Sequence, residues 1–187
     1  MEPFRSVRGG GARAWLAEPE AALLRNLVGQ VMELVEPQDG ELGSPRSDDA
    51  TIAALEAMLH EPGSEQPPTD PVLARLLPDG YRDDPEAAGE FRRYTEPALR
   101  SAKHQAAREM LDTLPAAGGK IQLTGDQALA WLKALNDVRL ALGVRLNVTE
   151  EFEEQWDGLD ADDPQRSAFE VYAWLGAVQE SLVHALA

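Results

Sequence analysis

The sequence predicts a mainly helical fold, formally of the α+β class: a bundle of about six helices with a small N-terminal hairpin and one later strand forming a minor sheet. Three observations support this prediction. Apolar residues recur at intervals of three and four in long segments, which is the spacing of one helix face. Proline follows an acidic residue where several of these segments begin, as at helix N-termini. Two short strand-like segments flank a run of three glycines, and a third such segment lies further along the chain.

The N-terminal part is expected to form the hairpin and a first long helix. Residues 4–7 and 13–16 flank the glycines at 9–11, which supply the turn. A helix then begins near Glu18, and its leucines and valines recur at helical spacing until Pro37 ends it.

A short helix and an irregular connector are expected next. Asp48 or Asp49 can cap a helix that carries four apolar residues up to residue 59. Residues 61–71 contain four prolines, so we expect an irregular surface connector there. One helical turn is expected over residues 72–77, and it should pack the connector against the rest of the domain.

The middle of the chain is expected to contain two consecutive helices. Asp84 and Pro85 have the composition of a cap followed by a first-turn proline. Pro97 either kinks this helix or lies in the first turn of a new helix capped by Thr95, and we favour the new helix.

The C-terminal part is expected to contain one strand and three helices. Residues 120–123 alternate like a strand, and a long helix follows from about residue 126 to Gly143, a glycine placed like a C-terminal cap. A small helix over about residues 149–156 precedes the last helix, which Asp163 caps. We further expect this later strand to pair with the hairpin, and the whole of residues 1–187 to form one domain.

Composition limits the classes of function. The chain has 17 Lys and Arg against 33 Asp and Glu, a formal charge of −16. Such a charge repels phosphate backbones and disfavours direct nucleic-acid binding. Cysteine is absent, which excludes disulfides, thiolate nucleophiles and cysteine zinc sites. No apolar run reaches the roughly 20 residues of a membrane helix, and no secretory signal is present, so a cytoplasmic location is expected.

Basic residues gather in one stretch of 17 residues, which is the candidate partner-binding edge. It comprises Arg92, Arg93, Arg100, Lys103, His104 and Arg108. Positions 100, 104 and 108 share one helix edge because they are four residues apart. The alternative is that the chain's own excess of acids neutralises this edge.

A buried polar anchor is expected in the helix that begins near residue 126. Arg139 falls inside the wide apolar arc of this helix, where a guanidinium must find a carboxylate or several carbonyl groups. We expect Arg139 to be such an anchor, with Asn136 as its companion. An anion site around Arg139 is the alternative.

Catalytic, cofactor and metal sites are not expected. His60, His104 and His184 are far apart and lack ligand spacing. The acidic tract at 150–163 lacks the ligand pattern of a calcium loop and is typical of a solvated face. No nucleophile elbow or glycine-rich phosphate loop is present. We therefore expect no enzyme activity.

Three segments together resemble a known family. They are EFRRYTE at 90–96, WLKALNDVRLALG at 131–143 and VYAWL at 171–175. The resemblance is to the actinobacterial domain-of-unknown-function family 2017, whose named member is the oxidative-stress regulator AosR, and it covers nearly the whole chain.

The resemblance implies a non-enzymatic, cytoplasmic regulatory protein. It implies action in the transcriptional or stress response through protein–protein contacts with the transcription machinery. The alternative is a binding module or adaptor of Clp-type regulated proteolysis, since family genes commonly lie beside the Clp adaptor. The redox role attributed to the named regulator uses cysteines, and a disulfide switch cannot carry over because this chain has no cysteine. The oligomeric state is not readable from the sequence.

Overall fold

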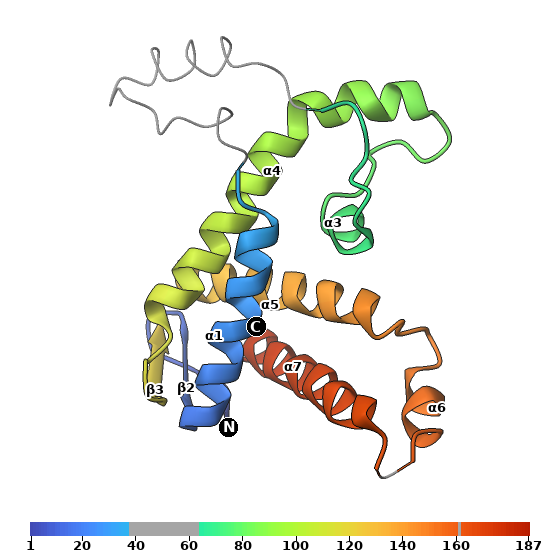
Figure 1. The fold of residues 1–187 in the computed structure, drawn as a ribbon. Helices are drawn as coiled ribbons and strands as arrows, with labels where there is room; N and C mark the ends of the chain where they lie inside the picture. The colour runs from blue at the N-terminus through green and yellow to red at the C-terminus, as the bar shows by residue number, and fades with distance from the viewer. Residues whose placement is uncertain (38–63, 161) are drawn as a thin grey trace, which may run out of the picture.

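The computed structural model describes residues 1–37, 64–160 and 162–187 (Figure 1). Six helices lie in these residues: α1 (Glu18–Leu34), α3 (Pro71–Leu76), α4 (Pro85–Thr113), α5 (Gly125–Arg145), α6 (Phe152–Asp157) and α7 (Pro164–Leu186). Three strands accompany them: β1 (Glu2–Ser6), β2 (Ala12–Leu16) and β3 (Gly119–Leu123). The mainly helical fold with a minor sheet is thereby confirmed. The short helix expected before residue 59, and residues 61–63 of the connector, lie outside the described residues.

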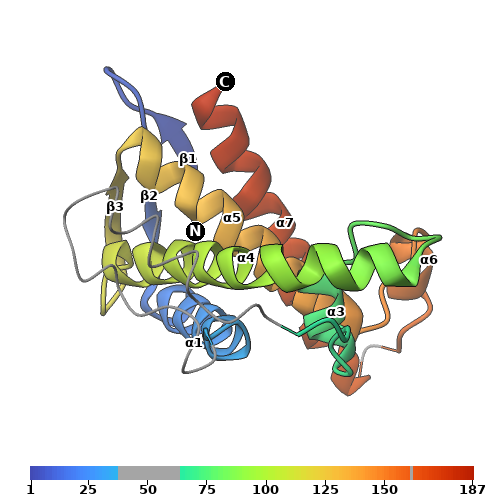
Figure 2. The ribbon, with the colours of Figure 1, turned by 90° about the horizontal axis from the view of Figure 1, so that it is seen from above.

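The helices pack around α5, which contacts α1, α3, α4 and α7. The sheet lies at one end of the molecule, and α3 and α6 lie at the other end (Figure 2). Helix α7 runs beside α5 and also contacts β1, so the C-terminal helix returns to the N-terminal strand. Among the described residues, no helix is long and apolar enough to cross a membrane.

The sheet has the order β1-β2-β3, and both strand pairs are antiparallel. This confirms the prediction that the later strand joins the hairpin. The side chains alternate along each strand, so Phe4, Ala14 and Ile121 face the core and their neighbours face outward. Gly11 has φ +96°, and an added Cβ would lie 2.1 Å from the carbonyl oxygen of Leu123. The turn therefore requires glycine at this position.

Trp131 occupies the centre of the core and is fully buried. Its ring lies edge-on to that of Phe4, with 5.7 Å between the ring centroids. Its indole Nε1 donates a hydrogen bond of 2.7 Å to the hydroxyl of Thr113. One side chain of α5 thus connects the sheet to α4, and its polar atom is satisfied.

The prediction of two consecutive helices around Pro97 is wrong. Helix α4 is continuous through Pro97, and Figure 1 shows it bending part-way along its length. Proline lacks an N–H and its ring crowds the preceding turn, which bends a helix without necessarily ending it. Thr95 does not cap a new helix; its hydroxyl donates to the carbonyl oxygen of Phe91, four residues earlier.

The expected end of α5 at Gly143 is also wrong. The helix continues to Arg145, and Asn147 has the left-handed conformation that often follows a helix end, with φ +51°. A Cβ at Gly143 would meet the ring of Tyr172 at 3.5 Å, so this glycine lies in a helix contact. The cap expected for the last helix is present, because the Asp163 carboxylate accepts from the backbone N–H of Gln165.

Candidate functional site

The first basic residue of α4, Arg92, is directed into the protein. Its side chain is 5% exposed and donates to the carbonyl oxygen of Leu77 at 3.2 Å. It also forms ion pairs with Asp79 and with Glu96. Burial alone would lower the pKa of Arg92, but the hydrogen bonds and charges of these two acids outweigh it and raise the pKa. Arg92 is therefore an internal cation.

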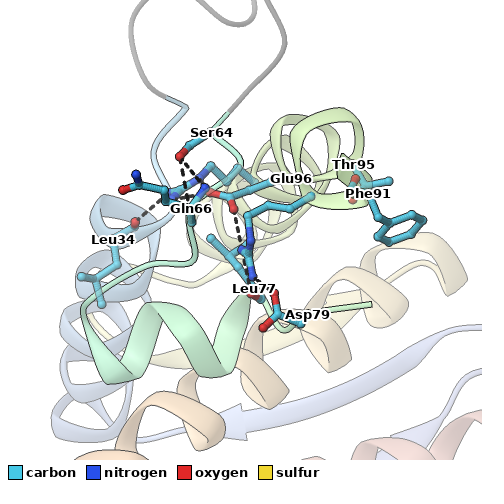
Figure 3. A network of polar contacts seen from close by, with 10 residues as sticks. Leu34, Ser64, Gln66, Leu77, Asp79, Phe91, Thr95 and Glu96 are labelled. Atoms are coloured by element: carbon cyan, nitrogen blue, oxygen red, sulfur yellow. Dashed lines mark hydrogen bonds and ion pairs between the residues drawn. The ribbon is translucent and has the colours of Figure 1, made fainter. Parts of the chain in front are cut away.

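Glu96 joins Arg92 to a second buried arginine. Its carboxylate lies 2.8 Å from Nη1 of Arg92 and 2.8 Å from Nη2 of Arg100. Arg100 also donates to the carbonyl oxygen of Leu34 at the end of α1, at 3.4 Å. Figure 3 shows Leu34, Leu77 and Glu96 gathered where α1, α3 and α4 approach one another. This network fixes the bent helix to its neighbours.

The remaining residues of the expected edge are partly neutralised as well. Lys103 forms an ion pair of 2.6 Å with the buried carboxylate of Asp137, and Arg93 pairs with exposed Glu65 at 3.1 Å. His104 is half-buried, and Arg108 is exposed. The six residues therefore do not form one exposed surface. Four of them, Arg92, Arg93, Arg100 and Lys103, form ion pairs with acids of the same chain.

The outer face of the sheet presents a different basic surface. Its two rows of outward-facing side chains run across the strands and comprise Glu2, Trp15 and Lys120, then Arg5, Arg13 and Gln122. Arg8 is exposed in the adjoining hairpin turn. We call the set of Arg5, Arg8, Arg13, Trp15 and Lys120 the basic sheet face.

The cations of the basic sheet face lack counter-ions within the part of the chain that the structure describes. None of its four cations forms an ion pair there. Arg5 and Arg13 are directly opposite each other on antiparallel strands, an arrangement in which like charges destabilise a sheet. Trp15 is 47% exposed between Glu2 and Lys120. The face combines unbalanced positive charge with an open aromatic ring.

Arg139, the expected polar anchor, is half-buried between α5 and α7. Its Nη1 donates to Gln179 at 2.9 Å, and its guanidinium carbon lies 5.2 Å from the centre of the Tyr172 ring. Its Nε is buried without a partner among the described residues. Asn136 is exposed, so its assignment as a buried anchor is wrong. The buried polar residue is the next one, Asp137.

A family model described as a domain of unknown function, DUF2017, matches residues 1–186. The chain belongs to the DUF2017 family. This confirms the family that the sequence segments indicate.

Proteins similar to this DUF2017 chain include regulators from mycobacteria. The Oxidative stress regulators AosR of Mycobacterium tuberculosis and Mycobacterium bovis are 40% identical to it over 184 residues, which cover 91% of this chain and 80% of theirs. The Putative oxidative stress regulator AosR of Mycobacterium leprae is 38% identical over 194 residues, covering 97% and 85%. No solved structure gives a significant match.

The sequence contained a signal for the basic sheet face of this DUF2017 chain. Arg13 and Trp15 alternate with buried residues in one strand, and Lys120 and Gln122 do so in another. Alternation alone places these side chains on a common outer face once the strands are known to pair. The charges at 92–108 are close in the sequence itself, whereas those of the sheet are brought together only by strand pairing.

Proposed function

We propose that this chain is a non-enzymatic regulatory protein of the oxidative-stress response, which acts by binding a partner protein through the basic sheet face. The names of its mycobacterial relatives support the regulatory role. The observation that carries the binding role is the opposed pair of Arg5 and Arg13, which has no counter-ion among the described residues. An acidic segment of a partner would neutralise this pair and remove its repulsion.

The chemistry of the face favours an acidic protein segment over a nucleic acid. Guanidinium groups bind carboxylates through paired N–H donors, and Trp15 offers an apolar surface to a neighbouring side chain of the partner. The face has a single exposed aromatic ring, whereas single-stranded nucleic acids usually stack successive bases on several. The net charge of −16 also repels a long polyanion more than a short acidic segment.

An oxidative signal cannot act on this chain through a thiol of its own. Cysteine is absent, so neither a disulfide nor a sulfenic acid can form here. Met110 is fully buried in the core and Met32 is half-buried, positions that suit packing. We therefore place the regulatory step in partner binding.

Affinity capture from the native host tests this proposal. The bait proteins are the wild type, the double variant Arg5→Glu/Arg13→Glu, and the control Arg108→Glu, which reverses an exposed charge on α4. The wild type and the control are expected to retain RNA polymerase or a sigma subunit at low salt, and to lose it as salt rises. The double variant is expected to lose it at low salt while keeping the wild-type thermal unfolding temperature, because both side chains are exposed.

A genetic readout makes the test specific for stress. A strain without the gene should show an altered transcript response to peroxide, which wild type and Arg108→Glu restore and the double variant does not. Capture of Clp components in place of polymerase would favour the proteolysis alternative. Equal capture and equal complementation by all three proteins would refute the basic sheet face as the binding site.

A further inference from the structure

A hollow is lined by residues of α3, of the C-terminal half of α5 and the turn after it, and of α7. Helix α3 lies at the end of the molecule away from the sheet (Figure 2). Its volume is about 340 Å³, within the range of small-molecule sites. Two arginines, Arg75 and Arg139, contribute to its lining. The rest is mostly apolar and includes Leu140, Val144, Val148 and the ring of Tyr172. Cationic and apolar surfaces therefore meet in one space.

Arg139 has donors that the protein leaves unused. Of its five N–H groups, one donates to Gln179, and the buried Nε has no partner among the described residues. The guanidinium lies over the Tyr172 ring, which holds it in place without satisfying its N–H donors. Because Nε is enclosed beside Gly176 of α7, a ligand in the hollow would be met by the N–H groups of Nη1 and Nη2.

The charge of the hollow is also uncompensated. Within the described residues neither Arg75 nor Arg139 forms an ion pair, although the chain has almost twice as many acids as bases. No acidic side chain is among those that line the hollow in this described part. The last carbonyl groups of α5 already accept backbone N–H groups, from Leu146, Asn147 and Val148. The described residues thus supply no counter-ion at this position.

We propose that this hollow binds a small organic anion. The oxyanion group, a carboxylate or a phosphate monoester, accepts hydrogen bonds from Arg75 and Arg139. The apolar body packs on Val144, Val148 and the Tyr172 ring. A hollow of this size exceeds what one inorganic phosphate fills, and its apolar lining favours a ligand with a carbon skeleton. The site is independent of the basic sheet face, so either proposal can fail without the other.

Isothermal titration calorimetry of the full chain tests the site with three probes: phenyl phosphate, benzoate and inorganic phosphate. The variants are Arg75→Ala, Arg139→Gln and the control Arg145→Ala. Arg145 is on the same helix but donates to Gln30 of α1 at 3.0 Å, outside the hollow. Arg75 is exposed, so its replacement leaves the fold intact and preserves the test even if Arg139→Gln unfolds the chain.

At least one organic anion is expected to bind the wild type and Arg145→Ala with equal affinity, and more tightly than inorganic phosphate. Arg75→Ala should weaken it about tenfold, since a charged hydrogen bond to an oxyanion is lost. A higher affinity for phenyl phosphate than for benzoate would identify the head group as a phosphate monoester. A higher affinity for benzoate would identify it as a carboxylate. Absence of heat with both organic anions at millimolar concentration, or equal weakening in Arg75→Ala and Arg145→Ala, would overturn the proposal.

Discussion

Replacing Glu96 with glutamine tests whether the network on α4 stabilises the fold. The Glu96 carboxylate lies 2.8 Å from one guanidinium nitrogen of Arg92 and from two of Arg100. Both arginines are buried, and the Glu96 side chain is only 13% exposed. Removing one partner of a buried ion pair costs about 3–5 kcal/mol, since the remaining charge loses its compensation. Glutamine keeps one acceptor oxygen and Arg92 keeps Asp79, so we expect a loss of about 3 kcal/mol, at the lower end of that range.

Urea unfolding followed by circular dichroism measures this loss as a lower midpoint at unchanged slope. The matched control is Glu65→Gln, since Glu65 also pairs with an arginine of α4 but is 62% exposed. An exposed pair contributes about 0–1 kcal/mol, so the control should unfold close to the wild type. If Glu96→Gln loses no more stability than Glu65→Gln, the inference that Glu96 compensates two buried cations is wrong.

Three further predictions concern the core, the turn and a buried acid. Trp131→Ala should cost about 3–5 kcal/mol in urea unfolding, because it removes the largest fully buried side chain. Gly10 and Gly11 have similar positive φ values, but only at Gly11 does an added Cβ collide with the backbone of β3. Gly11→Ala should therefore lower the thermal unfolding temperature well below that of Gly10→Ala. Burial raises the pKa of Asp137, and Lys103 only partly opposes this, so the folded chain binds that proton more tightly than the unfolded chain. As the pH falls from neutral through the raised pKa of folded Asp137 towards 3.8, the ordinary pKa of an aspartate, the wild type should gain stability relative to Asp137→Asn. Urea unfolding of both proteins at several pH values measures this gain.

Features that depend on neighbouring residues were predictable from the sequence. The cap of α7 needs only Asp163 and the N–H group of Gln165 two residues later. The hairpin follows from three glycines between two alternating segments, and the helix faces follow from apolar spacing. Each of these is decided within one element or one turn, so a single sequence contains the necessary information.

The two-helix prediction at Pro97 also left the ion-paired triad within the basic stretch unpredicted. Taking residues 95–97 as a helix start assigns Arg92 and Arg100 to different helices. In one continuous helix, Arg92, Glu96 and Arg100 are spaced by four residues and lie on one face, which favours an ion-paired triad. Proline propensity gave the wrong answer because the surrounding contacts of α4 hold the bend, and tertiary packing overrides a local preference.

The location of unbalanced cations is the most informative feature of this acidic chain. The 17 basic residues are outnumbered by 33 acids, yet among the described residues only Arg92, Arg93, Arg100 and Lys103 form ion pairs with acidic side chains. In the basic sheet face and in the hollow at Arg139, two or more cations without an ion pair among the described residues lie on one surface. Repulsion between Arg5 and Arg13 costs stability in the isolated chain and is relieved when an anion binds. An anion that binds only the folded state stabilises it by an amount that grows with the logarithm of one plus the ratio of ligand concentration to Kd, so both sites predict that their ligands raise the thermal unfolding temperature. At the sheet, an acidic peptide should do so in the wild type and in Arg108→Glu but not in Arg5→Glu/Arg13→Glu; the same rise in all three proteins would mean that the opposed arginines are not the site.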